Sequence, residues 1–274
     1  MQLFTRRQIV SSLAGGALAW QFARADAHGA QQAVELLTYA GSNSGIPSPF
    51  QVSPSGPGGP ILVSLIFDTL TWKDDKGLIP WLASEWSISS DGKTYTFQIV
   101  SGAAWQDGKP LTAEDVVFSF AYYAKHPYIW MRSDMVESAT AHGNTVQITL
   151  KRPYAAFLED ISGIVPIIPK HVWGSVTDPI AYAGSDRTMG SGPYMLAEYS
   201  ETEGAYRLTA NDAYWHGTPK IAEFRQLMVP AEALIQATEQ GEVDLASSTD
   251  VTIRDVFKND NRLAVHESAP LSIV

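Results

Sequence analysis

The sequence predicts an α/β fold, and the clearest pattern lies near the end of the 274-residue chain. Residues 223–229 read as a strand, residues 231–240 as a helix and residues 243–246 as a second strand. Gly241 is the residue type that most often follows the end of a helix. Two strands joined by one helix run in parallel through a right-handed crossover. We therefore expect parallel strands with a helix packed against them.

Two further patterns predict a hairpin and a capped helix earlier in the chain. The pair Asp91-Gly92 lies between two alternating runs, where it favours a tight hairpin because glycine adopts positive φ at little cost. The run that follows places Tyr95 and Phe97 on one face of a strand. Thr112 then begins a helix, and Asp115, three residues later, completes a variant of the capping box.

The remaining elements follow from apolar periodicity and from the positions of glycine and proline. A long loop at residues 41–60, rich in Gly, Pro and Ser, separates the first strand from a helix. In chain order we expect a strand at 34–39, a helix at 61–70, a strand around 86–88, a short strand around Trp105, a strand at 146–150, a short helix at 153–160, an irregular crossing segment at 165–169, a turn at 190–193, a strand at 194–198 and, antiparallel to it, a strand at 206–210.

The first 27 residues read as an export signal. Arg6 and Arg7 precede an uncharged stretch at residues 8–23, and Ala25-Asp26-Ala27 is a small-x-small cleavage pattern. The segment 5–10 resembles a twin-arginine signal, which directs a folded protein across the inner membrane; an ordinary secretory signal is the alternative. The uncharged stretch is shorter than the roughly 20 residues of a spanning helix. We expect a periplasmic protein, cleaved near Ala27.

The composition excludes several classes of function. The chain carries 29 acidic and 19 basic residues, a net charge of −10, and without a basic cluster it is a poor nucleic-acid binder. It has no cysteine, which excludes disulfides, a lipid anchor at cysteine and thiol chemistry. No two of its six histidines are three to five residues apart, so we expect no local metal site and no cofactor.

Polar residues that follow the predicted strands are the candidate solute contacts, because ligands of open sheets lie beyond the carboxyl ends of the strands. One group follows the first strand and another follows the last strand. An aromatic residue in the loop after the capped helix is a further candidate. Surface turns, hinge hydrogen bonds and core packing are the alternative roles for these residues. The candidates are Ser42, Asn43, Ser44, Trp130, Ser247, Ser248, Thr249 and Asp250.

No catalytic signature is present. The segment 41–45 reads Gly-Ser-Asn-Ser-Gly and not Gly-x-Ser-x-Gly, the pattern of a nucleophile elbow. Turn and cap positions account for Asp107, Glu114 and Asp115, and we assign His171 a structural role. The sequence therefore predicts a protein that is not an enzyme.

Five motifs occur in a fixed order: LIFDTL at 65–70, DGKTYTF at 91–97, WQDGKPLTAEDVVFSF at 105–120, PKHV at 169–172 and GSGPY at 190–194. Together they resemble the solute-binding proteins of the oligopeptide, dipeptide and nickel class, extracellular solute-binding protein family 5. The resemblance runs from about residue 36 to residue 250. It implies a type II periplasmic-binding-protein-like lobe, a mixed sheet with helices, that carries an inserted α+β sub-domain.

The resemblance also implies a division of the chain. Residues 34–54 and 175–250 would form an incomplete first-lobe core, and residues 55–170 the inserted sub-domain. Residues 251–274 would form the hinge and the start of a second lobe. Members of the family are longer and have two lobes, so we expect most of the second lobe to be missing, whether the sequence is a fragment or the gene is truncated.

The function implied by the resemblance is that of the substrate-binding component of an ABC importer. Such a receptor closes two lobes around a solute and delivers it to the permease and ATPase subunits. A peptide is the expected solute; sugars, opines and nickel chelates stay open as alternatives. A lone-lobe interaction or sensor module without transport activity is the second reading.

Overall fold

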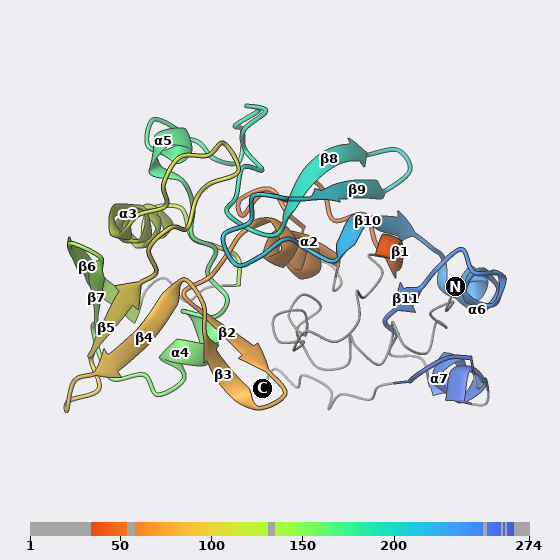
Figure 1. Ribbon diagram of the computed structural model, residues 1–274, viewed down its shortest axis with the longest axis horizontal. Helices are drawn as coiled ribbons and strands as arrows, with labels where there is room; N and C mark the ends of the chain where they lie inside the picture. Colours follow the sequence, from red (N-terminus) through yellow and green to blue (C-terminus); the bar gives the residue numbers. More distant parts are fainter. Residues whose placement is uncertain are drawn as a thin grey trace.

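The computed structural model describes residues 34–53, 58–130, 135–248, 251–258, 260 and 262–265. The predicted export segment, residues 1–27, lies outside this range. Two sheets lie at opposite sides of the view in Figure 1, with helix α2 (Gly58–Ile66) between them. One hydrophobic core joins the two sheets, because Phe224 and Tyr194 of one sheet and Phe97 and Ile148 of the other belong to the same buried cluster.

The larger sheet has five strands in the order β11-β1-β10-β9-β8. Strand β1 is parallel to both β10 and β11, whereas β9 is antiparallel to β10 and to β8. The antiparallel pair β8–β9 is confirmed, and so is the parallel direction of β10 and β11, with β1 lying between them. The strands are β1 (Val34–Gly41), β8 (Tyr194–Ser200), β9 (Ala205–Ala210), β10 (Ile221–Met228) and β11 (Leu245–Ala246).

Helix α6 (Ala231–Gln240) makes the crossover between β10 and β11. It ends at Gly241, whose φ of 84° lies in the left-handed region that glycine adopts most easily, so this prediction is confirmed. Helix α7 (Val251–Lys258) follows β11. Apolar side chains of α6, of α7 and of the segment before β11 form a second, smaller core with β1: Ala40, Leu234, Ala237, Val243 and Ile253.

The smaller sheet has four strands in the order β4-β5-β7-β6, all antiparallel. The predicted hairpin turn is present, with Gly92 at a φ of 69°. Helix α3 (Ala113–Tyr123) packs against β6 and β7, and its first turn is capped because the Asp115 carboxylate accepts the Thr112 N–H at 2.9 Å. The strands are β4 (Ala83–Ile88), β5 (Thr94–Ile99), β6 (Val136–His142) and β7 (Thr145–Leu150).

The predicted helix at 61–70 is present as α2, but its bounds are wrong. Helix α2 begins earlier, at Gly58, and ends at Ile66. The end has a tertiary cause: the Ile66 carbonyl accepts the N–H of Gly192 at 2.8 Å, from a segment more than a hundred residues away. A Cβ on Gly192 would lie 2.6 Å from the same carbonyl, so the close approach requires glycine. Sequence periodicity contains no information about this partner.

Several short elements also differ from the predictions. The predicted strand around Trp105 is a single bridge between Ala104 and Pro110, and the predicted helix at 153–160 is only α4 (Phe157–Asp160). Strand β6 was not predicted because it consists largely of small and polar residues without apolar alternation. The hairpin β2 (Thr71–Asp74) and β3 (Gly77–Pro80) and the short helix α5 (Lys170–Trp173) were also not predicted.

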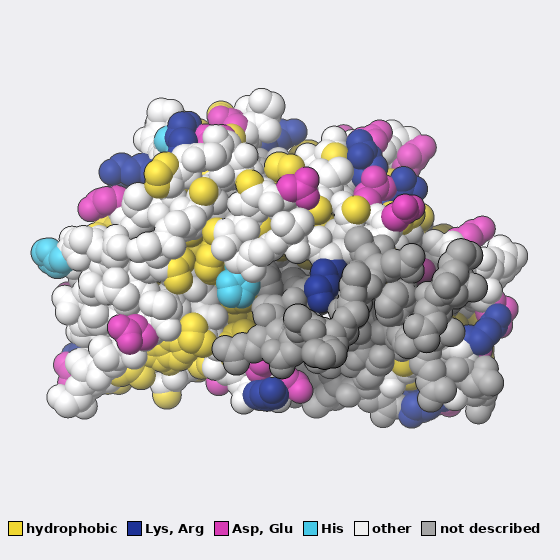
Figure 2. Space-filling view, in the orientation of Figure 1, with side chains coloured by type: hydrophobic (Ala, Val, Ile, Leu, Met, Phe, Trp, Pro, Cys, Tyr) yellow, Lys and Arg dark blue, Asp and Glu magenta, His cyan; other side chains and the backbone are white. Residues whose placement is uncertain are grey.

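The outer face of β8 and β9 is strongly charged. Figure 2 shows acidic and basic side chains gathered over these strands. Arg207 of β9 pairs with Glu198 at 3.3 Å and with Glu223 at 3.7 Å, and Arg225 also pairs with Glu223. Ion pairs between exposed side chains such as these add little stability. Within the residues that the structure describes, no helix has the length and apolar character needed to cross a membrane.

Candidate functional site

The carboxyl ends of three parallel strands meet at one edge of the five-stranded sheet. Tyr39 is in register with Leu245 of β11, and Gly41 at the end of β1 is in register with Met228 at the end of β10. The loop at 42–45 and the residues after β11 therefore begin at this common edge. In open α/β sheets this edge is where ligands bind.

A row of polar side chains crosses the sheet just before this edge. Tyr39 of β1 is in register with Gln226 of β10, Gln226 with Tyr206 of β9, and Tyr206 with Tyr199 of β8. Residues in register on neighbouring strands project from the same face of a sheet. We call Tyr39, Gln226, Tyr206 and Tyr199 the polar row.

The first two members of the polar row bind the loops at the edge. The Tyr39 hydroxyl lies 2.9 Å from Ser247 Oγ, so it holds the segment that follows β11. Gln226 Nε2 donates to the Ser42 carbonyl at 2.9 Å, so it holds the loop that follows β1. Tyr39 and Gln226 are each at most 1 % exposed, so both side chains are buried while they hold these loops.

The other two members hold the rest of the same loop. The Tyr206 hydroxyl accepts the Ser44 N–H at 2.8 Å and also lies 2.8 Å from the Gly45 carbonyl. The Tyr199 hydroxyl donates to Asn43 Oδ1 at 2.9 Å. The loop is therefore fixed at consecutive positions by side chains from three strands.

Two tyrosines of the polar row, Tyr39 and Tyr206, carry no charge at neutral pH. Burial raises the pKa of the Tyr39 hydroxyl, although the hydrogen bond with Ser247 opposes this shift. Burial likewise raises the pKa of Tyr206 far above its ordinary value. Two buried polar atoms have no hydrogen-bond partner: Oε1 of the row residue Gln226, and Oγ of Ser42 in the adjacent loop.

The structure gives different surroundings to the candidates in the first loop. Ser42 is half-buried, and its carbonyl binds Gln226. Asn43 has a structural task, since its Nδ2 donates to the Glu201 carbonyl at 2.9 Å while its Oδ1 accepts from Tyr199. Ser44 is fully buried, and its hydroxyl donates to the Ser42 carbonyl, so that hydroxyl is turned into the protein.

The remaining candidates lie at two other places. Ser247 and Ser248 are exposed at the edge of the sheet, immediately after β11. Trp130 is half-buried and packs on the core, with its ring 5.3 Å from Tyr128 in an edge-to-face arrangement. Thr249 and Asp250 lie outside the described residues.

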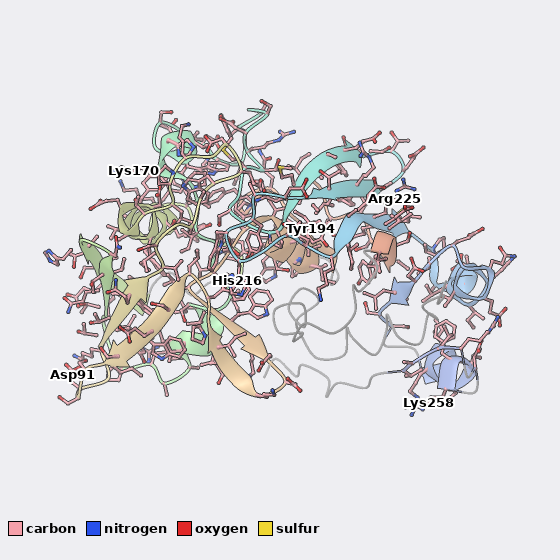
Figure 3. The ribbon with its side chains drawn as sticks, viewed as in Figure 1. Asp91, Lys170, Tyr194, His216, Arg225 and Lys258 are labelled. Carbon is pink, nitrogen blue, oxygen red and sulfur yellow. The ribbon has the colours of Figure 1, made fainter. Side chains whose placement is uncertain are left out.

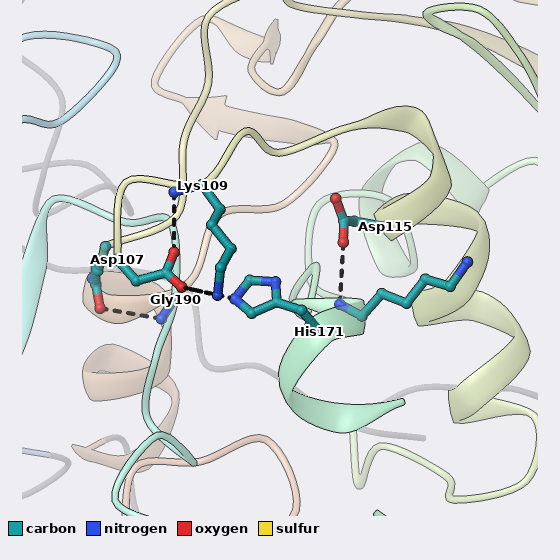
Figure 4. Close-up of polar contacts among 7 residues, drawn as sticks. Asp107, Lys109, Asp115, His171 and Gly190 are labelled. Carbon is teal, nitrogen blue, oxygen red and sulfur yellow. Dashed lines mark hydrogen bonds and ion pairs between the residues drawn. The ribbon is translucent and has the colours of Figure 1, made fainter. Parts of the chain in front are cut away.

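The acidic residues at 107 and 115 have structural partners. Asp107 contacts Lys109 at 2.7 Å and the His171 ring at 3.0 Å, and the second carboxylate oxygen of Asp115 accepts the Lys170 N–H at 3.1 Å (Figure 4). These contacts attach α5 to the first turn of α3 and to the segment before it. They agree with the turn, cap and structural roles expected from the sequence.

A buried carboxylate joins the two sheets. Asp68 is 2 % exposed and accepts four hydrogen bonds, from Trp81 Nε1, the Tyr214 hydroxyl, the Ser191 hydroxyl and Trp215 Nε1, at 2.8 to 3.0 Å. Trp81 lies between β3 and β4, whereas Tyr214 and Trp215 follow β9. Burial raises the pKa of the Asp68 carboxyl, and the four donors oppose that shift. This residue connects segments from both halves of the fold.

An aromatic surface lies beside this carboxylate. Figure 3 shows His216 between the two sheets, and Figure 2 shows hydrophobic side chains next to the histidine at the centre of the same face. The His216 ring lies 4.6 Å from Trp81 and 4.9 Å from Trp215. Burial lowers the pKa of His216, while the charge of Asp68 opposes the shift.

Sequence reasoning missed the polar row and the role of Asp68. A signal for Gln226 exists, because alternation along β10 places it on the same face as the buried Phe224. A signal for Asp68 also exists, since it interrupts the apolar run Leu65–Leu70. Neither pattern names the partners of these side chains. Among the described residues, no group of three His, Cys, Asp or Glu side chains could hold a metal ion.

The mixed five-stranded sheet, its polar carboxyl edge and the four-stranded sheet with its helix define a solute-binding lobe of the type II periplasmic class. The chain belongs to the bacterial extracellular solute-binding proteins, family 5: the family model, described as the middle part of that family, matches residues 77–274.

Individual relatives agree with this assignment. The chain is 34% identical over 171 residues to the dipeptide-binding protein of Escherichia coli. This match covers 53% of this chain and 31% of the relative. It is 28% identical over 191 residues to the nickel-binding periplasmic protein of the same species, covering 66% of this chain and 36% of the relative.

A solved structure has the same fold. The oligopeptide-binding protein AppA of Bacillus subtilis, in complex with a nonapeptide, superposes with a TM-score of 0.72 at 24% identity. The superposition covers 85% of this chain and 47% of AppA. The chain thus spans about a third of the length of the curated relatives it matches and about half of that solved structure.

Proposed function

We propose that this chain contributes the first lobe of the periplasmic substrate-binding component of an ABC importer, which binds a peptide or a similar small solute between two lobes. The observation that supports this most is the carboxyl edge of β1, β10 and β11, where the loop at 42–45 and the segment after β11 begin side by side. Membership of family 5 supports the same proposal. The chain has no catalytic role in it.

Ser247 and Ser248, which are exposed at this edge, are the residues proposed to contact the solute with their side chains. Ser42 stays in the proposal as a contact through atoms other than its hydroxyl, which is buried, with Asn43 and Ser44 keeping the loop in shape. Trp130, Thr249 and Asp250 stay in the proposal as contacts from the sub-domain and the hinge. In the same proposal residues 34–54 and 175–250 form the lobe core, residues 55–170 the sub-domain and residues 251–274 the hinge. The solute-loaded form would dock on the permease and ATPase subunits.

The test is to capture the protein from the periplasm of its own cells under native conditions and to identify released small molecules by mass spectrometry. We expect peptides in near-stoichiometric amount, and loss of most of them from a Ser247→Ala protein, which lacks an exposed hydroxyl at the edge. Asp212→Asn, an exposed change far from the edge, serves as the control and should keep them. Recovery of the protein from the cytoplasm, or of protein without solute, would contradict the proposal.

A further inference from the structure

Gln226 is an unusual residue for the centre of a sheet. It is fully buried, yet of its side-chain amide atoms only Nε2 has a partner, the Ser42 carbonyl, while Oε1 has none. A buried polar group without a partner lowers stability, and an apolar side chain of similar size would avoid that cost. What Gln226 provides, and an apolar side chain would not, is the hydrogen bond from its Nε2 to the Ser42 carbonyl.

Two glycines, Gly41 and Gly58, leave the space that the Gln226 side-chain amide occupies. A Cβ added to Gly41 would lie 2.6 Å from Gln226 Cδ, and one added to Gly58 would lie 2.7 Å from Gln226 Nε2. Real Cβ atoms do not approach other heavy atoms so closely. Glycine at both positions therefore leaves a slot between the end of β1 and the start of α2, and the amide passes through it to reach Ser42.

The neighbours of Gln226 in the polar row also form hydrogen bonds with residues that follow β1 and β11. In register across the sheet, Tyr39 reaches Ser247, and Tyr206 reaches Ser44 and Gly45. Each member of the polar row thus binds a residue of the two segments that begin at the carboxyl edge. Loops held in this way keep one geometry before a ligand arrives, and such preorganisation lowers the entropic cost of binding.

We propose that Gln226 is a positioning residue for solute binding, and that the polar row presets the loop at 42–45. The proposal rests on the proposed function, because it assigns a task to the site described there. Gln226 does not itself contact the solute. It places Ser42, and through Ser42 the rest of the loop.

The decisive measurement is hydrogen–deuterium exchange of single amides in Gln226→Met, which keeps the size of the side chain and removes the donor. The reporters are the amides of Ser44 and Gly45, which bind Tyr206 and Asn43 and not Gln226. We expect both amides to exchange about tenfold faster or more, while amides of the core strands keep their rates. Gly58→Ala, which closes the slot from the other side, should give the same pattern.

The control is Tyr194→Phe. Tyr194 lies in β8 of the same sheet, is buried and also donates to one backbone carbonyl, that of Ile221, at 3.0 Å. It should leave the amides of Ser44 and Gly45 unchanged. If Gln226→Met alters these amides no more than Tyr194→Phe does, or if it speeds exchange across the whole sheet, Gln226 has only a structural role and the proposal is wrong.

A second readout connects the row to binding. In protein captured from the periplasm, Gln226→Met should lower the amount of bound peptide about tenfold, while Tyr194→Phe stays within about twofold of the wild type. A wild-type protein that carries no solute would count against the proposed function. The exchange measurement needs no solute, so it decides the role of Gln226 in either case.

Discussion

Replacing Asp68 by asparagine tests how much one buried carboxylate contributes to holding the two sheets together. The two groups have nearly the same shape, so the change alters hydrogen bonding and charge without a cavity. One carboxylate oxygen accepts Trp81 Nε1 and the Tyr214 hydroxyl, and the other accepts the Ser191 hydroxyl and Trp215 Nε1. Each oxygen therefore faces one indole and one hydroxyl.

The magnitude follows from what each donor can do. Asparagine replaces one oxygen by an NH2 group, whichever way its amide is turned. The hydroxyl on that side can rotate and become an acceptor, but an indole N–H only donates. One buried indole therefore loses its acceptor, which costs about 1–3 kcal/mol, and the other bonds weaken because their acceptor is no longer charged. Relief of the buried charge offsets the weakening of these bonds, because burial outweighs the four donors in the pKa of Asp68. The unpaired indole remains, and we expect a net loss of about 1–3 kcal/mol.

The assay is equilibrium unfolding in urea, followed by far-ultraviolet circular dichroism because the substitution changes the surroundings of two tryptophans. Asp212→Asn, at an exposed aspartate, is the matched control and should change the free energy of unfolding by less than about 0.5 kcal/mol. If Asp68→Asn is as stable as that control, the four hydrogen bonds do not determine the stability of the junction and the reasoning fails.

Three further predictions concern stability. Burial raises the native pKa of Asp68 above its value of about 4 in an unfolded chain. The stability that this group contributes is therefore fully present below about pH 4 and is lost as the pH rises through the native pKa. The difference in unfolding free energy between wild type and Asp68→Asn should grow on acidification from pH 7, and a difference that shrinks would contradict the pKa shift. Asp115→Ala leaves the N–H groups of Thr112 and Lys170 without their acceptor and should cost about 2–3 kcal/mol in urea unfolding, with Glu114→Ala nearly neutral. Gly190→Ala would place a Cβ 1.9 Å from the Ile66 carbonyl and should cost about 3 kcal/mol or more by thermal unfolding, whereas Gly143→Ala, with open space around it, should cost about 1 kcal/mol; equal losses would show that the backbone moves aside.

Local chemistry was sufficient to predict much of the fold. The Asp91-Gly92 hairpin, the capped start of α3, the end of α6 at Gly241 and the pairing of β8 with β9 each depend on residues close together in the chain. Propensity, turn geometry and capping act over such distances. Motifs in a fixed order also indicated the family correctly.

The site required the tertiary structure. Tyr39, Gln226 and Tyr206 are far apart in the chain, and only the strand order β1-β10-β9 and its register bring them into one row. The same holds for Asp68, whose four donors come from three separate segments. By itself the sequence determined most of the longer strands and helices and where polar loops follow them, but not the short elements or β6. Which side chains meet at the edge was decided by the packing of the sheet, because contacts between distant segments depend on a register that no local pattern contains.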